Sequence, residues 1–164
     1  MASLQIGTHT FHWGSRTYVM GILNVTPDSF SGDGIIAKGD TVKASVEQAK
    51  EFLSNGADIL DVGGESTRPG SQPVNAEAEL ERVLPVISAI AKELPDALIS
   101  IDTYKAKVAA AAFKTGAHIL NDVWALRADP ELASVAAAFQ VPVILMHNRS
   151  NPASVEVRAQ LGNA

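Results

Sequence analysis

The sequence predicts an α/β fold of the (β/α)8, TIM-barrel type, truncated after about five βα strands and preceded by an N-terminal β-hairpin. Five short apolar runs support this prediction, at residues 18–25, 57–62, 97–101, 118–120 and 141–146. Each run ends in polar side chains, and the segments between the runs show helical periodicity. A barrel of this type carries its active site at the C-terminal ends of its strands, where these polar residues are expected to gather.

The first elements follow from local patterns. Residues 4–19 alternate and hold Gly14-Ser15-Arg16 between two β-prone stretches, which predicts a hairpin with strands at 4–6 and 17–19. The first barrel strand, 18–25, is continuously apolar, as in a parallel strand buried on both faces. Residues 30–39 are rich in Gly and Ser and are expected to form a loop.

Capping residues predict the helices that follow. We expect helices at 41–54, ended by Gly56, and at about 76–94, capped by Asn75 and either kinked or divided at Pro85. A third helix is expected to begin at Thr103 and end before Gly116, and a fourth to begin at Asp129-Pro130. The remaining strands are predicted at residues 58–62, 98–101, 118–120 and 142–146. Residues 149–164 are expected to form a loop.

Size and composition limit the classes of function. A closed barrel usually needs about 250 residues, so a 164-residue chain is expected to form one domain, 1–164, that is incomplete at its C-terminus. A net charge of −5 without a basic stripe argues against a nucleic-acid partner. The absence of cysteine excludes disulfides and thiolate metal sites. No apolar run is long enough to span a membrane and no signal peptide is evident, so a cytoplasmic location is expected.

Several polar residues at the predicted strand ends have side chains that suit ligand binding. Asn24 could offer an amide oxygen to Mg²⁺, and Arg68 has the planar fork that suits an anion. The carboxylate of Asp102 could accept paired N–H groups from a heterocycle, with the amide of Asn121 beside it. Taken one at a time, each also has a plain structural explanation: a turn, a solvated surface residue or, for Asp102, a helix cap.

Four stretches carry a resemblance to a known family: GILNVTPDSFSGDG, GADILDVGGESTRPG, ISIDTYKAKVAAAAFKTGAHILNDVWAL and VPVILMHNR. Together, in this order, they resemble dihydropteroate synthase over about residues 18–150. The resemblance implies a (β/α)8 barrel and a transferase of folate biosynthesis. The implied reaction condenses 6-hydroxymethyl-7,8-dihydropterin diphosphate with p-aminobenzoate, giving dihydropteroate and pyrophosphate.

The resemblance also implies site residues, position by position. Asn24 matches the residue that helps to hold Mg²⁺ on the diphosphate. The matched substrate-binding positions are Phe30, Thr67, Arg68, Pro69, Asp102, Asn121 and Met146. Within this set Asp102, Asn121 and Met146 match pterin-binding positions, whereas Phe30, Arg68 and Pro69 belong to loops near the aminobenzoate. No catalytic side chain is assigned, because the implied mechanism needs no protein nucleophile. Asp61 and His147 are left outside the site.

The chain departs from the family pattern in one respect. Family members continue through three more strands, which supply an acidic pterin ligand, a lysine and a basic cluster for the diphosphate. The sequence therefore resembles the N-terminal portion of the synthase, and unpaired barrel edges would favour a homo-oligomer. Three alternatives stay open: a pterin-binding methyltransferase domain, a non-catalytic half-barrel, and an unrelated Mg²⁺-dependent barrel enzyme.

Overall fold

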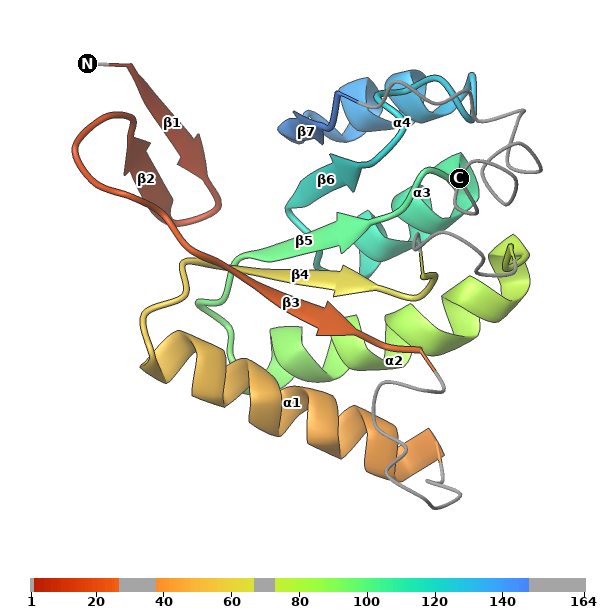
Figure 1. The fold of residues 1–164 in the computed structure, drawn as a ribbon, viewed down its shortest axis with the longest axis horizontal. Helices are drawn as coiled ribbons and strands as arrows, with labels where there is room; N and C mark the ends of the chain where they lie inside the picture. Colours follow the sequence, from red (N-terminus) through yellow and green to blue (C-terminus); the bar gives the residue numbers. More distant parts are fainter. Residues whose placement is uncertain (1, 27–37, 67–72, 148–164) are drawn as a thin grey trace, which may run out of the picture.

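The computed structural model describes residues 2–26, 38–66 and 73–147, which form two sheets and four helices (Figure 1). A two-stranded antiparallel hairpin forms one sheet, and five parallel strands form the other. The strands are β1 (Ser3–Ile6), β2 (His9–His12), β3 (Met20–Asn24), β4 (Ile59–Gly63), β5 (Ile99–Asp102), β6 (Ile119–Asp122) and β7 (Val143–Leu145). The helices are α1 (Lys38–Ser54), α2 (Ala76–Glu93), α3 (Ala106–Thr115) and α4 (Leu132–Phe139).

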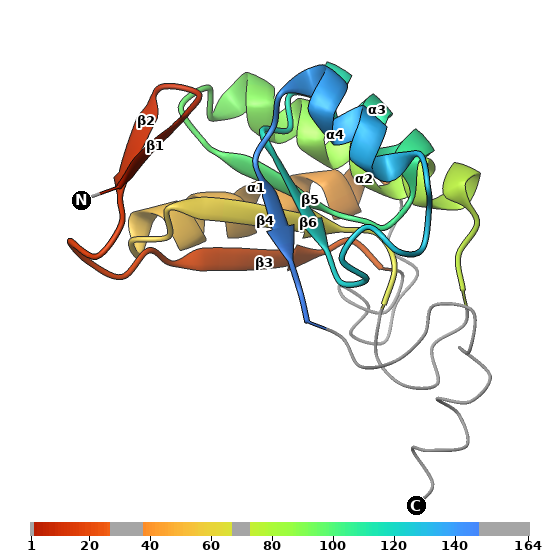
Figure 2. The same ribbon diagram turned by 90° about the horizontal axis from the view of Figure 1, so that it is seen from above.

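The strand order identifies the sheet as part of a barrel. Neighbours run β3-β4-β5-β6-β7, in chain order and without a reversal. The helices follow one another along one side of the sheet, α1 beside α2, α2 beside α3, and α3 beside α4 (Figures 1 and 2). A doubly wound sheet would reverse its strand order and place helices on both faces. The predicted barrel-type α/β fold is confirmed.

The two faces of the sheet contain different side chains, because residues alternate along each strand. The outer face carries Leu23, Leu60 and Ile101, which are fully buried against the helices. Residues of all four helices pack against them in this core, among them Val46 and Ala49 of α1. The inner face instead carries apolar side chains at the strand starts and polar side chains at the strand ends.

The hairpin closes the inner face at the strand starts. Its Ile6 and Phe11 form a second apolar cluster with Ile59, Leu98 and Ile119 of the sheet. Gly7, at the hairpin turn, has φ +56°, a left-handed conformation that glycine adopts without strain. Figure 2 shows the hairpin at the end of the sheet opposite the arrowheads. The hairpin therefore covers the inner face of the sheet at the strand starts, the end opposite the polar residues.

Four sequence predictions about element bounds need correction. The hairpin pairs Ser3–Ile6 with His9–His12 and not with 17–19, because the backbone of Val19 bonds to Asp58 and Ile59 instead. Helix α1 begins at Lys38, inside the predicted loop. Helix α4 begins at Leu132 and not at Asp129-Pro130, because the Asp129 carboxylate bonds to the amides of Ala106 and Glu131 ahead of it. Helix α2 is one continuous helix through Pro85, so the alternative of two shorter helices is excluded, and Asn75 caps it as predicted.

The start of α3 is the fourth correction. This helix begins at Ala106 rather than near Thr103, and the amide of Ala106 donates to Asp129 Oδ2 at 2.8 Å. Asp129 therefore caps α3 from a distant segment, while its Oδ1 also accepts from the Glu131 amide ahead of α4. Gly116 ends α3 as expected. In the part of the chain that the structure describes, no helix is both long enough and apolar enough to cross a membrane.

A close approach between β3 and α1 gives a first testable prediction. A Cβ at Gly21 would lie 2.5 Å from Phe52 Cδ2, so Gly21→Ala should destabilise the chain by about 1–3 kcal/mol through overpacking. Urea unfolding measures this change. Adding Phe52→Leu should recover part of the loss, since the smaller side chain makes room. Strictly additive effects of the two substitutions would contradict the contact.

The hairpin contact gives a second prediction, concerning pH. The Ile99 amide donates to Nδ1 of His118, whose ring lies against Gly7, and burial, together with nearby His9, lowers the pKa of His118. The unfolded chain therefore binds more protons below about pH 6.5, and folding stability is lost as the pH falls through this range. His118→Asn should reduce this acid-dependent loss, measured as urea midpoints at pH 7.5 and 5. Parallel midpoint changes in both proteins would disprove it.

Candidate active site

Three residues that sequence analysis assigned to a binding site lie in one row across the sheet. The register pairs Asn24 with Gly63, Gly63 with Asp102, and Asp102 with Asn121. The row continues to Ile144 of β7. Directly paired residues of a parallel sheet place their side chains on the same face, so these three polar groups share the inner face at the strand ends.

Gly63 leaves an opening in the middle of this row. A Cβ at Gly63 would lie 3.4 Å from Asp102 Oδ2, so the Asp102 carboxyl lies beside bare backbone. Asn24 is exposed, whereas Asp102 and Asn121 are half-buried. The row therefore offers a ligand an amide, a stretch of backbone, a carboxyl and a second amide in that order.

Asp61 supports the row from a position two residues before Gly63 on β4. It lies on β4 opposite Ser100, and it is buried, with 2 % of its surface exposed. Asn121 Nδ2 donates to Asp61 Oδ2 at 3.0 Å, which fixes the plane of the Asn121 amide. Burial raises the pKa of Asp61, although the Ser100 hydroxyl and the Asn121 amide oppose this effect.

Asp102 has a raised pKa because it lies half-buried among acidic groups. Burial is the main cause, and the negative charges of Asp61, Glu79, Asp122 and Glu65 add to it, raising the pKa of Asp102 to about 7. The carboxyl is therefore about half ionised at neutral pH. A ligand that donates two N–H groups would favour the ionised form and would bind more strongly as the pH rises through this value.

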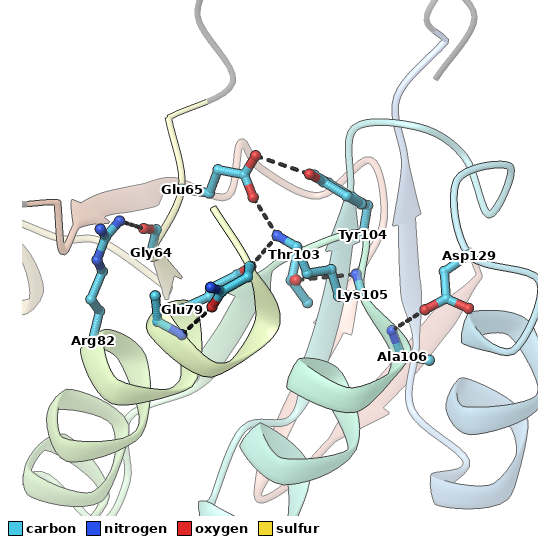
Figure 3. A network of polar contacts seen from close by, with 11 residues as sticks. Gly64, Glu65, Glu79, Arg82, Thr103, Tyr104, Lys105, Ala106 and Asp129 are labelled. Carbon is cyan, nitrogen blue, oxygen red and sulfur yellow. Dashed lines mark hydrogen bonds and ion pairs between the residues drawn. The ribbon is translucent and has the colours of Figure 1, made fainter. Parts of the chain in front are cut away.

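A second polar network joins the loops that follow β4 and β5 (Figure 3). Lys105 Nζ contacts Oε2 of both Glu65 and Glu79, and the Tyr104 hydroxyl donates to Glu65 Oε1 at 2.9 Å. Glu79 is completely buried, although it stands in the first turn of α2. The network thus links two loops and a helix directly behind the row.

Gly64 allows α2 to approach the end of β4. A Cβ at Gly64 would lie 2.7 Å from Val83 Cγ1, so no larger residue fits without movement. Arg82 of the same helix donates to the Gly64 carbonyl at 2.7 Å (Figure 3). The backbone that leads from β4 toward Glu65 is therefore held by α2 on one side and by Lys105 on the other.

Comparison with known proteins gives this arrangement a family. Residues 20–163 match the family described as pterin binding enzyme. The chain belongs to the pterin binding enzyme family. A dihydropteroate synthase from Clostridium beijerinckii is 53 % identical over 148 residues, covering 90 % of this chain and 54 % of the relative. The resemblance to dihydropteroate synthase inferred from the sequence is confirmed.

Solved structures of dihydropteroate synthases share the fold. The Xanthomonas albilineans enzyme with 4-aminobenzoic acid has a TM-score of 0.81 and 43 % identity, covering 90 % of this chain and 52 % of that one. The Burkholderia cenocepacia enzyme complexed with 7,8-dihydropteroate has a TM-score of 0.77 and 35 % identity, covering 94 % and 49 %. The chain thus spans about half the length of the relatives it matches.

The structure brings together some of the site residues expected for this chain. Asn24, Asp102 and Asn121 share the row, whereas Met146 follows β7 with 45 % of its surface exposed. His147, left outside the predicted site, is exposed. Four expected residues lie outside the described part of the chain: Phe30, Thr67, Arg68 and Pro69.

Sequence reasoning missed several residues that support the site. Asp61 was set aside, yet it holds Asn121. No role was assigned to the four residues of the second network, Glu65, Glu79, Tyr104 and Lys105. One signal was available: Glu79 lies three residues after Ala76 and four before Val83, on the apolar side of α2. A carboxylate at such a position indicates a buried charge with a partner.

Few of the described side chains near the row could hold a metal ion. Within residues 2–26, 38–66 and 73–147, no three His, Cys, Asp or Glu side chains are grouped so as to hold an ion. Mg²⁺, however, often takes only one or two protein oxygens and completes its shell with substrate phosphates and water. The exposed amide of Asn24, at the edge of the row, fits that kind of partial site.

The charge state of Asp102 gives a third prediction. Its folded-state pKa of about 7 exceeds the ordinary value of 3.8, so the folded chain binds more protons than the unfolded chain between these values. The stability contributed by the protonated carboxyl is lost as the pH rises through about 7. Asp102→Asn should therefore stabilise the chain more at pH 8 than at pH 4.5, as measured by urea unfolding. An equal effect at both pH values would contradict the raised pKa.

Proposed function

We propose that this chain contributes to the dihydropteroate synthase reaction, with the inner-face row as its pterin site. The observation that carries the proposal is the register that sets Asn24, Asp102 and Asn121 on one face at the strand ends. Relatives of about twice this length are named dihydropteroate synthases, and one solved relative is complexed with 7,8-dihydropteroate.

The row suits the pterin ring in its hydrogen-bonding groups. A pterin carries an amino group and a ring N–H side by side, and a carboxylate can accept both. The half-buried Asp102 offers that carboxylate, and the Asn121 amide, held by Asp61, offers a neighbouring contact of fixed orientation. Gly63 leaves space for a flat ring to lie against the backbone between Asn24 and Asp102. Met146, on the far side of Asn121, is proposed as an apolar contact to the same ring.

The proposed reaction is a substitution at the methylene carbon of the pterin. The bond from this carbon to the diphosphate oxygen breaks, and its electron pair leaves with pyrophosphate. The amine nitrogen of p-aminobenzoate forms the new bond to the same carbon and then loses one proton. By orienting the pterin, Asp102 and Asn121 place the methylene carbon where the amine can reach it.

Two further parts of the site are also proposals: four residues outside the described part of the chain, and a metal ion. Phe30, Thr67, Arg68 and Pro69 are proposed to contact the substrates, with Arg68 and Pro69 near p-aminobenzoate. Mg²⁺ is proposed as the cofactor, with Asn24 among its ligands; when bound, it would offset negative charge on the diphosphate. The proposed partners are these small molecules, and a cytoplasmic location and a homo-oligomer stay predictions.

Two measurements on the 164-residue chain test the proposal. Titration calorimetry with pterin, at pH 8, measures binding to the row. Incorporation of labelled p-aminobenzoate, with the dihydropterin diphosphate and Mg²⁺, measures the reaction. Asp102→Ala should weaken pterin binding by about tenfold to a hundredfold, since a hydrogen bond to a charged group is worth about 1.5–3 kcal/mol.

The controls separate the alternatives. Asn55→Ala removes an exposed amide that bonds to the Glu51 carbonyl at the end of α1, and it should leave pterin binding unchanged. Labelled product would support the synthase reaction. Pterin binding without product would favour the pterin-binding module or the methyltransferase domain. A folded chain with neither activity, or equal weakening by both variants, would contradict the proposed site.

A further inference from the structure

Lys105 occupies a position that the proposed reaction does not explain. Its ammonium group lies between two carboxylates from different elements, Glu65 of the loop after β4 and Glu79 of helix α2 (Figure 3). The three side chains are 15 %, 10 % and 0 % exposed. The ammonium also lies 4.2 Å from the centre of the Tyr104 ring, and the Tyr104 hydroxyl bonds to Glu65.

The next lysine along the chain shows how unusual this arrangement is. Lys107 pairs with Glu77, also across the gap between α3 and α2, but these side chains are 62 % and 67 % exposed. An exposed pair contributes little to stability, whereas a buried pair costs desolvation that its attraction only partly offsets. Stabilisation of the fold alone therefore does not explain why these charges are buried around Lys105.

The location of the network indicates what it does. Lys105 is three residues after Asp102, and Glu65 is two residues after Gly63, the residue paired with Asp102 in the row. Glu79 stands at the start of α2, behind both loops (Figure 3). A single cation thus connects the two segments that leave the adjacent strands β4 and β5, one of which directly follows Asp102.

We propose that Lys105 is a positioning residue, which holds the loops after β4 and β5 together and thereby sets the position and the charge of Asp102. Lys105 acts through Glu65 and Glu79 and does not itself contact the substrate. The inference deepens the proposed function, because it rests on Asp102 being the carboxyl that accepts the N–H groups of the pterin.

The electrostatics around Asp102 make the proposal testable. The charged groups that face it are Asp61 of β4, Glu65 of the following loop, Glu79 of α2 and Asp122 of β6, all acidic. Lys105 offsets two of them. Removing its charge should stabilise protonated Asp102 further, whereas removing the charge of Glu65 should do the opposite. A role in folding alone predicts no such reversal of sign.

The experiment follows the Asp102 carboxyl of the ligand-free chain by carbon NMR as the pH is varied. We expect Lys105→Met to raise the Asp102 titration midpoint by about one pH unit, and Glu65→Gln to lower it. Lys107→Met is the matched control and should leave the midpoint unchanged, while Lys105→Arg should retain most of the wild-type value. If Lys105→Met does not fold, Glu65→Gln still tests the sign of the midpoint shift, and Lys105→Arg still tests whether a cation at this position preserves the midpoint.

A binding measurement links the titration to function. A rise of one unit from about 7 would reduce the ionised fraction of Asp102 at pH 7 from about one half to about one tenth. Pterin affinity at pH 7 should then fall about fivefold in Lys105→Met and recover at pH 9. A loss that persists at pH 9 would be assigned to displaced loops, the positional part of the proposal.

Two results would overturn the inference. The first is an Asp102 midpoint that does not move in either variant, and the second is a midpoint that moves in the same direction in both. Because the titration uses the ligand-free chain, it decides the inference even if the chain binds no pterin. Failure to bind pterin with the expected titration shifts would instead refute the proposed function and leave the role of Lys105 intact.

Discussion

The parallel register of the five-stranded sheet is the constraint on which the rest of the structure depends. Because paired residues share a face, one pattern of pairing sends Leu60, Val62 and Ile101 toward the helices and leaves Asp61, Ser100 and Asp102 inside. A slip of one residue would exchange the two sets, placing carboxylates against α2 and aliphatic side chains at the site. The packing of the outer face therefore determines which residues can meet a ligand.

The inner face contains a concentration of acidic groups that the fold must accommodate. Titratable groups at the two ends of the strands have opposite pH dependences. The raised pKa of Asp102 favours the folded chain at lower pH, whereas the lowered pKa of His118, near the hairpin, favours it at higher pH. The two groups lie at opposite ends of the strands, so their contributions should separate cleanly in single variants. At the acidic end, Lys105 pairs with Glu65 and Glu79, and the Asn121 amide donates to Asp61.

Local patterns in the sequence predicted the barrel-type sheet, its five strands, the Asn75 cap and the strand-end positions of Asn24, Asp102 and Asn121. These succeeded because apolar runs, caps and strand-end polar residues are local signals. The hairpin partner and the start of α3 depend on contacts that are distant in sequence: Asp58 with Val19, and Asp129 with Ala106. Lys105 was missed for the same reason, because its two partners lie 40 and 26 residues away. A charged residue can be read from the sequence, but its partner in the folded chain cannot when the two are far apart in the sequence.

The hairpin under the sheet has a consequence for how such a protein can change over time. Its Ile6 and Phe11 cover the strand starts, while every residue of the row stands at the strand ends. Substitutions in the hairpin can therefore change folding stability without changing which ligand the row binds. Substitutions in the loops at the strand ends can change ligand selectivity without weakening the packing of the hairpin. A lineage under pressure from a competing ligand could vary one end of the molecule while the other compensates for the lost stability.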